Sequence, residues 1–367
     1  MKVLLLNFIL STSVNGKIIR RKSNDDTMIY AMARGFVKNG HSVTLAAAEE
    51  FKPLQPEDDL NFEIIYFKSR ARSIFKPHLL PWPKGLGRYL KNNGQNFDMI
   101  LSVDVFSIPT IIAARQFRSK MLIWQEMAFM QHMLGGLPAK LWYNVIAPYF
   151  IKNAPIITQS EKAKEFIRHY LPNVSDTIVG HGSNSDLFYP SENSEEYFVV
   201  ISMLVKRKRI DRILQKFSTF LKETKLSSYT LKIVGEGPEE LSLKTQAEEL
   251  GISQNVKFEG FLEHSTIAAI GRKAKALLID TQQDNNMVTI PESIVNGTPV
   301  LTNNVPNNSV FISKYGLGIA KDNWDWQDLE QMIIRYDEFH NACISHRHKF
   351  SNDGSAAILT TTFINFK

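Results

Sequence analysis

The sequence predicts an α/β protein of two domains, each a doubly wound parallel sheet covered by helices. Three observations predict this fold class. The chain has 367 residues, which is enough for two domains of ordinary size. Short apolar runs alternate with helical patterns twice along the chain, which is typical of parallel strands joined by helices. Between the two series, residues 178–190 are rich in Gly, Ser, Asn and Pro and predict an irregular hinge.

The first series opens with a strand–helix–strand unit. Residues 2–8 are an apolar run that predicts a buried first strand. Apolar residues at helical spacing predict a helix over 26–39, with Ser23 or Asn24 as its N-cap, and 41–45 is the next strand. Further strands are expected at 62–67, 99–103, 121–124 and 156–160, and helices at 141–151 and 161–170.

The second series repeats this alternation after the hinge. Strands are expected at 197–202, 229–234 and 256–260, and an amphipathic helix over 210–221. The tail after about Trp324 has helical composition. The second half therefore forms a second doubly wound domain.

Composition excludes several classes of protein. The single cysteine, Cys343, allows no internal disulfide, and no apolar run approaches the roughly 20 residues of a membrane helix. The first ten residues resemble a signal peptide only superficially, because no small-residue cleavage site follows them. The net charge of +6 comes from short, scattered basic clusters without a nucleic-acid-binding motif. We therefore expect an anionic membrane surface or phosphates as partners, and no nucleic acid.

One stretch predicts a ligand site at the carboxyl end of a strand. Residues 276–279 form a strand, the polar loop 281–286 follows, and Thr289 is expected to N-cap a short helix that ends at Gly297. A helix N-terminus at a strand's carboxyl end favours phosphate. The carboxylate of Glu292 can accept two hydrogen bonds from a vicinal diol such as a ribose. On local sequence alone, the simpler interpretation is favoured, in which Glu292 only complements the helix dipole.

This stretch resembles the nucleotide-sugar signature of the family 4 glycosyltransferases, which have the GT-B fold. The signature is an acidic residue, seven residues, Glu, a short helix and G-x-P-V; here it reads D-NNMVTIP-E-SIVN-G-T-P-V. Asp284 stands where the family usually has Glu, and 285–287 replace its Pro-Phe-Gly. The "GH-x-V" at 40–43 also matches the opening of these enzymes.

Three further segments match the family. Lys208 aligns with the lysine of "KG-x-D", although Arg209 replaces the glycine and Met203 stands where the family has an upstream arginine. Residues 235–238 match a "G-x-G-P" loop near the nucleotide base, where a plain tight turn is an alternative. Glu126 or His132 lies where members carry a histidine that faces the transferred sugar.

The resemblance implies a GT-B fold of two Rossmann-like domains facing a cleft. Their expected bounds are 1–178 and 190–345, with residues from about 346 to 367 crossing back to the first domain. The implied reaction moves a sugar, with retention of configuration, from a nucleoside-diphosphate sugar to an acceptor, without a metal. The implied catalytic residues are Lys208, Asp284 and Glu126. The implied donor-binding residues are Glu292, Lys206, Arg207, Gly235, Gly237, Val288 and Thr289.

The expected acceptor is a glycan or a lipid-linked glycan in polysaccharide, capsule or lipopolysaccharide synthesis. The expected location is the cytoplasm, at the inner face of a membrane. Two alternatives stay open: a protein with this fold that binds without catalysis, and a nucleotide-sugar epimerase. A nicotinamide dehydrogenase is disfavoured, because no G-x-G-x-x-G follows the first strand.

Overall fold

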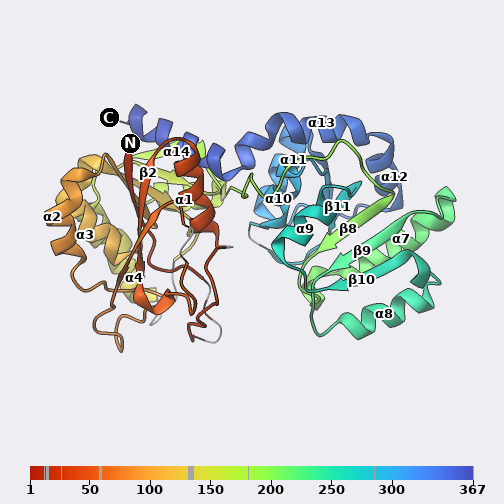
Figure 1. Cartoon of the computed structure of the whole chain (residues 1–367), viewed down its shortest axis with the longest axis horizontal. Helices are drawn as coiled ribbons and strands as arrows, with labels where there is room; N and C mark the ends of the chain where they lie inside the picture. The colour runs from red at the N-terminus through yellow and green to blue at the C-terminus, as the bar shows by residue number, and fades with distance from the viewer. Residues whose placement is uncertain are drawn as a thin grey trace. The chain divides into compact units, whose positions relative to one another are not determined.

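The computed structural model describes the chain except for residues 12, 14, 15, 26, 58, 59, 131–135, 181, 285 and 367. The chain divides into two compact units (Figure 1). Unit 1 comprises Met1–Gly182 and Asn352–Lys367, and unit 2 comprises Ser183–Ser351. Each unit contains one parallel sheet with its own helices, so the predicted fold class is confirmed.

Unit 1 is built on a seven-stranded sheet with the order β3-β2-β1-β4-β5-β6-β7. Its strands are β1 (Lys2–Leu6), β2 (Ser42–Ala48), β3 (Glu63–Phe67), β4 (Met99–Val103), β5 (Met121–Gln125), β6 (Ile156–Thr158) and β7 (Val174–Ile178). Its helices are α1 (Met28–Lys38), α2 (Leu86–Asn93), α3 (Ile108–Phe117), α4 (Leu137–Leu141), α5 (Ala147–Phe150), α6 (Glu161–Arg168) and α14 (Asn352–Asn365). The central strands are apolar runs because helices cover both faces of the sheet.

The first helix begins later than the sequence predicts. Its N-cap is Thr27, so the expectation of a cap at Ser23 or Asn24 is wrong. The Asn24 side chain is buried and donates instead to the carbonyl of Phe51, at 2.9 Å. That contact joins two segments 27 residues apart, which local sequence does not reveal.

The helix expected at 141–151 starts four residues earlier and is not uniform. It consists of α4, a π-helical turn at Trp142–Ile146 (η5) and α5. Its buried face includes Ala139, Trp142, Tyr143 and Ala147. Among the helices that the structure describes, none has the length and apolar character needed to span a membrane.

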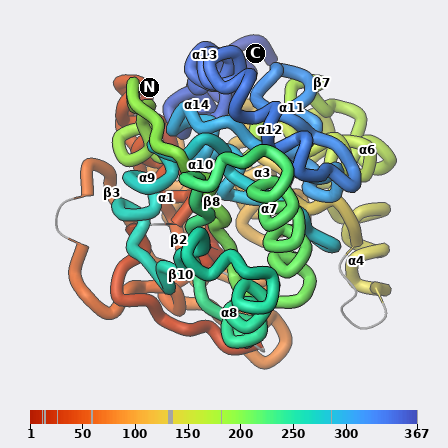
Figure 2. The backbone as a smooth tube through the Cα atoms, turned by 90° about the vertical axis from the view of Figure 1, so that its right-hand side faces the viewer, coloured from red at the N-terminus to blue at the C-terminus, as the bar shows by residue number. Residues whose placement is uncertain are grey.

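Unit 2 contains a six-stranded parallel sheet with the order β10-β9-β8-β11-β12-β13. Its strands are β8 (Tyr197–Ile201), β9 (Thr230–Val234), β10 (Val256–Gly260), β11 (Ala276–Ile279), β12 (Val300–Thr302) and β13 (Gly318–Ala320). Its helices are α7 (Ile210–Thr224), α8 (Glu240–Glu249), α9 (His264–Gly271), α10 (Thr289–Val295), α11 (Val310–Tyr315), α12 (Trp326–Ile334) and α13 (Tyr336–His346). Helices α7 and α8 are neighbours on this sheet (Figure 2).

The last helix returns to unit 1, as the resemblance implies. Helix α14 packs along α1 (Figure 1). Asn352 donates to the carbonyl of Ala31 at 2.8 Å, and Asn39 donates to that of Asp353 at 2.7 Å. Gly35 lies so close that a Cβ there would be 2.3 Å from the Asn352 carbonyl oxygen. The C-terminal segment is therefore part of the fold of unit 1.

Candidate functional site

The order of strands in unit 2 brings together the segments that the sequence singles out. Strand β8 pairs in parallel with β11 on one side and with β9 on the other. Parallel strands end at one edge of the sheet, where open α/β sheets bind ligands. The segments that follow β8 (203–209), β9 (235–238) and β11 (280–288) therefore lie at the same edge.

A cationic turn and an acidic loop meet at this edge. The Nζ of Lys208 lies 2.5 Å from Oδ2 of Asp284, and Arg207 Nη1 lies 3.3 Å from the same oxygen. Only 11% of the Lys208 side chain and 17% of the Asp284 side chain are exposed. The backbone ties the two segments as well, because Gln282 donates its N–H to the Arg207 carbonyl at 2.7 Å. The carboxylate thus holds two cations side by side.

Lys206 is not part of this arrangement. It is the first residue of the 3₁₀ turn Lys206–Lys208, its side chain is exposed, and it has no carboxylate partner among the described residues. Met203, at the position of the family's arginine, is 58% exposed. Of the two basic residues Lys206 and Arg207, only Arg207 contacts Asp284.

A second group of charges, which the sequence reasoning missed, lies behind the turn. Asp280 is 3% exposed and accepts a hydrogen bond from Lys216 Nζ at 2.6 Å. Arg209 and Arg212 lie 3.5 and 3.7 Å from its two oxygens. Burial lowers the pKa of Lys216, whose ammonium also lies 3.8 Å from the ring of Trp324. The signal in the sequence was the helical spacing of these three basic residues, together with an acidic residue at the end of a strand.

Arg209 has a left-handed backbone conformation, with φ of 48°. Glycine adopts this conformation without strain, whereas other residues disfavour it. This conformation is a physical reason why glycine suits this position in the family. Arg209 adopts the same conformation despite its strain, and its guanidinium lies beside Asp280 as a third cation.

Glu292 lies in the first turn of α10 with little exposure to solvent. Its side chain is 12% exposed, and its Oε1 is 3.9 Å from Nε2 of His264, the first residue of α9. Burial raises the pKa of the Glu292 carboxyl to about 8. In its ionised form this carboxylate can accept hydrogen bonds from two hydroxyls.

The expected role of Thr289 as an N-cap is wrong. The N-cap is Val288, which already has helical backbone angles, and it makes no side-chain cap. The turn before α10 is held instead by Asn308, whose side chain donates to the Met287 carbonyl at 2.8 Å and accepts from its N–H at 3.2 Å. Thr289 is the first helical residue, and its buried hydroxyl has no hydrogen-bond partner among the described residues.

Gly235 and Gly237 have a packing role. A Cβ at Gly235, where φ is +129°, would lie 2.0 Å from the Ser202 carbonyl oxygen. A Cβ at Gly237 would lie 2.3 Å from that of Leu204. The Leu204 N–H donates to the carbonyl of Glu236 at 2.9 Å. The two glycines therefore let the loop after β9 lie directly on the chain that follows β8, and any contact with a base stays a prediction.

Glu126 belongs to unit 1 and follows β5. Its backbone N–H and that of Met127 donate to Oδ1 of Asp104, at 2.8 and 3.1 Å. The alternative residue, His132, lies outside the described residues. The contact of Glu126 with a transferred sugar stays a prediction. Within the described part of the chain, no group of three His, Cys, Asp or Glu residues has an arrangement that holds a metal ion.

The whole fold has counterparts among solved structures. A glycosyltransferase from Rickettsia africae superposes with a TM-score of 0.64 at 14% identity, covering 100% of this chain and 98% of that one. HepE of Anabaena, in complex with UDP, superposes with a TM-score of 0.57 at 15% identity, covering 100% and 97%. The chain thus has the GT-B fold of glycosyltransferases.

Sequence comparison matches most of unit 2 to a family model. Residues 187–354 match the model of the glycosyl transferases group 1. The chain is also 28% identical over 127 residues to the alpha-monoglucosyldiacylglycerol synthase of Streptococcus pneumoniae. That match covers 34% of this chain and spans only 28% of the length of the relative.

Proposed function

We propose that this protein is a family 4 glycosyltransferase that moves a sugar from a nucleoside-diphosphate sugar to an acceptor hydroxyl, with retention of configuration. The observation that carries the proposal is the meeting of Arg207 and Lys208 with Asp284 in a segment of the group 1 family. The UDP complex of HepE, which has a similar fold, supports a nucleotide as the ligand.

The two cations would neutralise the diphosphate. Its charge grows at the leaving oxygen as the glycosidic bond breaks, so a fixed cation stabilises the transition state more than the ground state. In the free protein Asp284 keeps Arg207 and Lys208 close together. With a donor bound, the diphosphate would take over these cations, and Asp284 would accept a hydrogen bond from the sugar.

Glu292 would hold the ribose through its two hydroxyls, and the N–H groups of Val288 and Thr289 would approach the diphosphate. The bond between the anomeric carbon and the phosphate oxygen breaks as the bond to the acceptor oxygen forms. The proton of the acceptor hydroxyl passes to the leaving phosphate oxygen. No protein base and no metal are needed in this scheme.

The acceptor is proposed to be lipid-linked and to be recognised by unit 1 at the inner face of an anionic membrane. The supporting feature is an apolar stripe on the α4–η5–α5 segment: Leu137, Leu141, Val145 and Tyr149 are 71%, 55%, 55% and 67% exposed. No Asp or Glu occurs from 127 to 160. Such a face can lie in a membrane interface. The name of the pneumococcal relative also contains a lipid, diacylglycerol.

Turnover of the donor tests the proposal. A panel of nucleoside diphosphates is first screened for thermal stabilisation, because a ligand of the folded state raises its stability by mass action. Sugar transfer from the matching donors to lipid extracts is then followed by mass spectrometry. A transferred sugar supports the proposal. Binding without turnover would instead identify a non-catalytic binding protein, and an altered donor sugar without an acceptor would identify an epimerase.

A further inference from the structure

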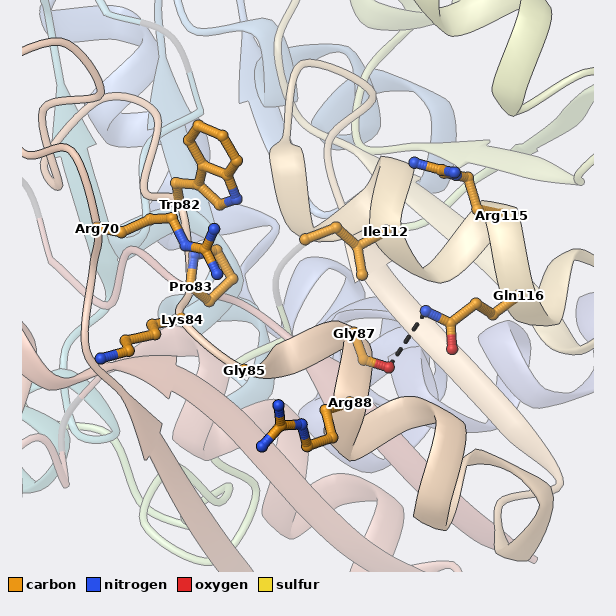
Figure 3. A pocket seen from close by; sticks show the side chains of 10 residues that line it. All are labelled: Arg70, Trp82, Pro83, Lys84, Gly85, Gly87, Arg88, Ile112, Arg115 and Gln116. Atoms are coloured by element: carbon orange, nitrogen blue, oxygen red, sulfur yellow. Dashed lines mark hydrogen bonds between the residues drawn. The ribbon is translucent and has the colours of Figure 1, made fainter.

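Unit 1 contains a cavity of about 630 Å³ that lies outside every segment assigned above (Figure 3). Three segments line it: the loop after β3, the start of α2, and the middle and end of α3. The lining residues are Arg70, Trp82, Pro83, Lys84, Gly85, Gly87, Arg88, Ile112, Arg115 and Gln116. A cavity of this size is large enough for a small organic molecule as well as for a single ion.

The walls of the cavity are held by hydrogen bonds. The two arms of the loop pair through the N–H of Arg70, which donates to the Trp82 carbonyl at 2.9 Å, and that of Lys84, which donates to the Lys68 carbonyl at 2.8 Å. On the opposite side, Gln116 Nε2 donates to the Gly87 carbonyl at 3.2 Å (Figure 3). The backbone of these walls is therefore held in place by contacts within the protein.

The cavity is strongly cationic. Arg70, Lys84, Arg88 and Arg115 line it, and no acidic residue does. Among the described residues, none of these four side chains has a carboxylate partner, whereas Arg72 in the same loop pairs with Glu50 at 2.9 Å. The surrounding sequence is depleted of acid in the same way, because no Asp or Glu occurs from 64 to 97.

Two of the cations are also positioned by aromatic rings. The guanidinium carbon of Arg70 lies 5.1 Å from the centre of the Trp82 ring, and that of Arg115 lies 5.5 Å from the ring of Phe150. Such contacts orient a guanidinium without neutralising it. Figure 3 shows that the three arginines come from three different segments around the hollow.

We propose that this cavity binds the phosphate group of an organic phosphate, such as a phosphorylated saccharide or the headgroup of an anionic phospholipid. Guanidinium groups form paired hydrogen bonds with phosphate oxygens. The first turn of the eight-residue helix α2, at Gly87 and Arg88, adds backbone N–H groups of favourable polarity. Trp82 and Ile112 offer apolar surface to the organic part of the ligand. The proposal does not depend on the transfer reaction.

The test measures binding by the full chain without a sugar donor. The soluble probes are inorganic phosphate and glycerol 3-phosphate, measured by calorimetric titration. The membrane probes are vesicles of phosphatidylglycerol mixed with phosphatidylcholine, and vesicles of phosphatidylcholine alone, measured by co-sedimentation. The test variant is the double substitution Arg88→Ala with Arg115→Ala. The matched control is the pair Lys91→Ala and Lys120→Ala, which removes equal charge from residues that do not line the cavity.

We expect the test variant to bind at least tenfold more weakly than wild type to whichever probe binds, and the control to stay within twofold. Binding of glycerol 3-phosphate would identify a soluble phosphate ester as the source. Binding of the anionic vesicles alone would identify a lipid headgroup. The proposal is overturned if no probe binds, or if the control loses as much binding as the test variant, since general surface charge would then be the cause. Circular dichroism of each variant verifies the fold.

Discussion

The ammonium group of Lys208 and the carboxylate of Asp284 form an ion pair at 2.5 Å, across 76 residues of sequence. In the proposed reaction each residue contacts a different part of the donor, the diphosphate for Lys208 and the sugar for Asp284. Asp284 keeps the cation close to the sheet edge. In the proposed reaction, a diphosphate would compete with Asp284 for this cation.

Lys208→Ala should lower turnover by about 10²–10³-fold, a typical loss for one group that stabilises developing charge, with a smaller effect on donor binding. Arg207→Ala should also reduce turnover, because Arg207 shares the Asp284 carboxylate. Lys206→Ala is the matched control, since its exposed side chain does not contact Asp284. Single-turnover transfer measures all three variants. Equal rates for all of them and wild type would indicate that this turn is a solvated basic surface with no part in the reaction.

Glu292→Ala should weaken nucleotide binding by very roughly 1.5–3 kcal/mol, because a charge-assisted contact with the ribose is lost. The affinity of wild type should also rise between pH 7 and 9, since burial raises the pKa of Glu292 to about 8 and the ionised form accepts both hydroxyls. Calorimetric titration over this range is the measurement. The assignment fails if Glu292→Ala binds every nucleotide as tightly as wild type does.

The stability of the ligand-free protein should fall as pH rises toward 8. Burial raises the pKa of Glu292 above its ordinary value of 4.5, so between these pH values the folded state binds more protons than the unfolded state. The contribution is fully present below about pH 4.5 and is lost as pH rises through 8. Glu292→Gln carries no titrating group, so its unfolding free energy should depend less steeply on pH. Urea unfolding at several pH values compares the two proteins; parallel curves would contradict the prediction.

Gly235→Ala should destabilise the protein by more than about 2 kcal/mol, because the new Cβ would lie 2.0 Å from the Ser202 carbonyl oxygen. Gly251→Ala is the matched control. Gly251 also has positive φ, but no atom lies within 4 Å of the position of its Cβ, so it should lose only about 1 kcal/mol. Thermal unfolding of both variants measures the difference. Equal losses of stability would show that the Cβ added at Gly235 is accommodated without the expected clash.

Sugar transfer should persist in excess EDTA, because cationic side chains and helix ends are proposed to neutralise the diphosphate. The control is an EDTA-treated sample to which magnesium or manganese is returned. Loss of transfer on chelation, with recovery on adding either ion, would show that a metal carries this charge instead.

The sequence by itself determined the class of fold and the segments that form the candidate site. Apolar runs such as 2–6 and 276–279 are typical of strands that are buried on both faces. Their alternation with amphipathic helices favours a parallel α/β arrangement. Whatever the order of the strands, the turns that follow their carboxyl ends lie at one edge of the sheet. The sequence therefore predicted that Lys208 and Asp284 lie at this edge.

Only the tertiary structure decided which of these residues touch. The pairing of β8 with β11 places Arg207, and not Lys206, beside Asp284. Asn308, from a distant segment, holds the turn before α10, where the sequence had suggested a cap by Thr289. The cationic cavity joins a loop, α2 and α3. Local sequence sets the preferences of single elements, but contacts between distant segments depend on strand order and packing, which no short window of sequence contains.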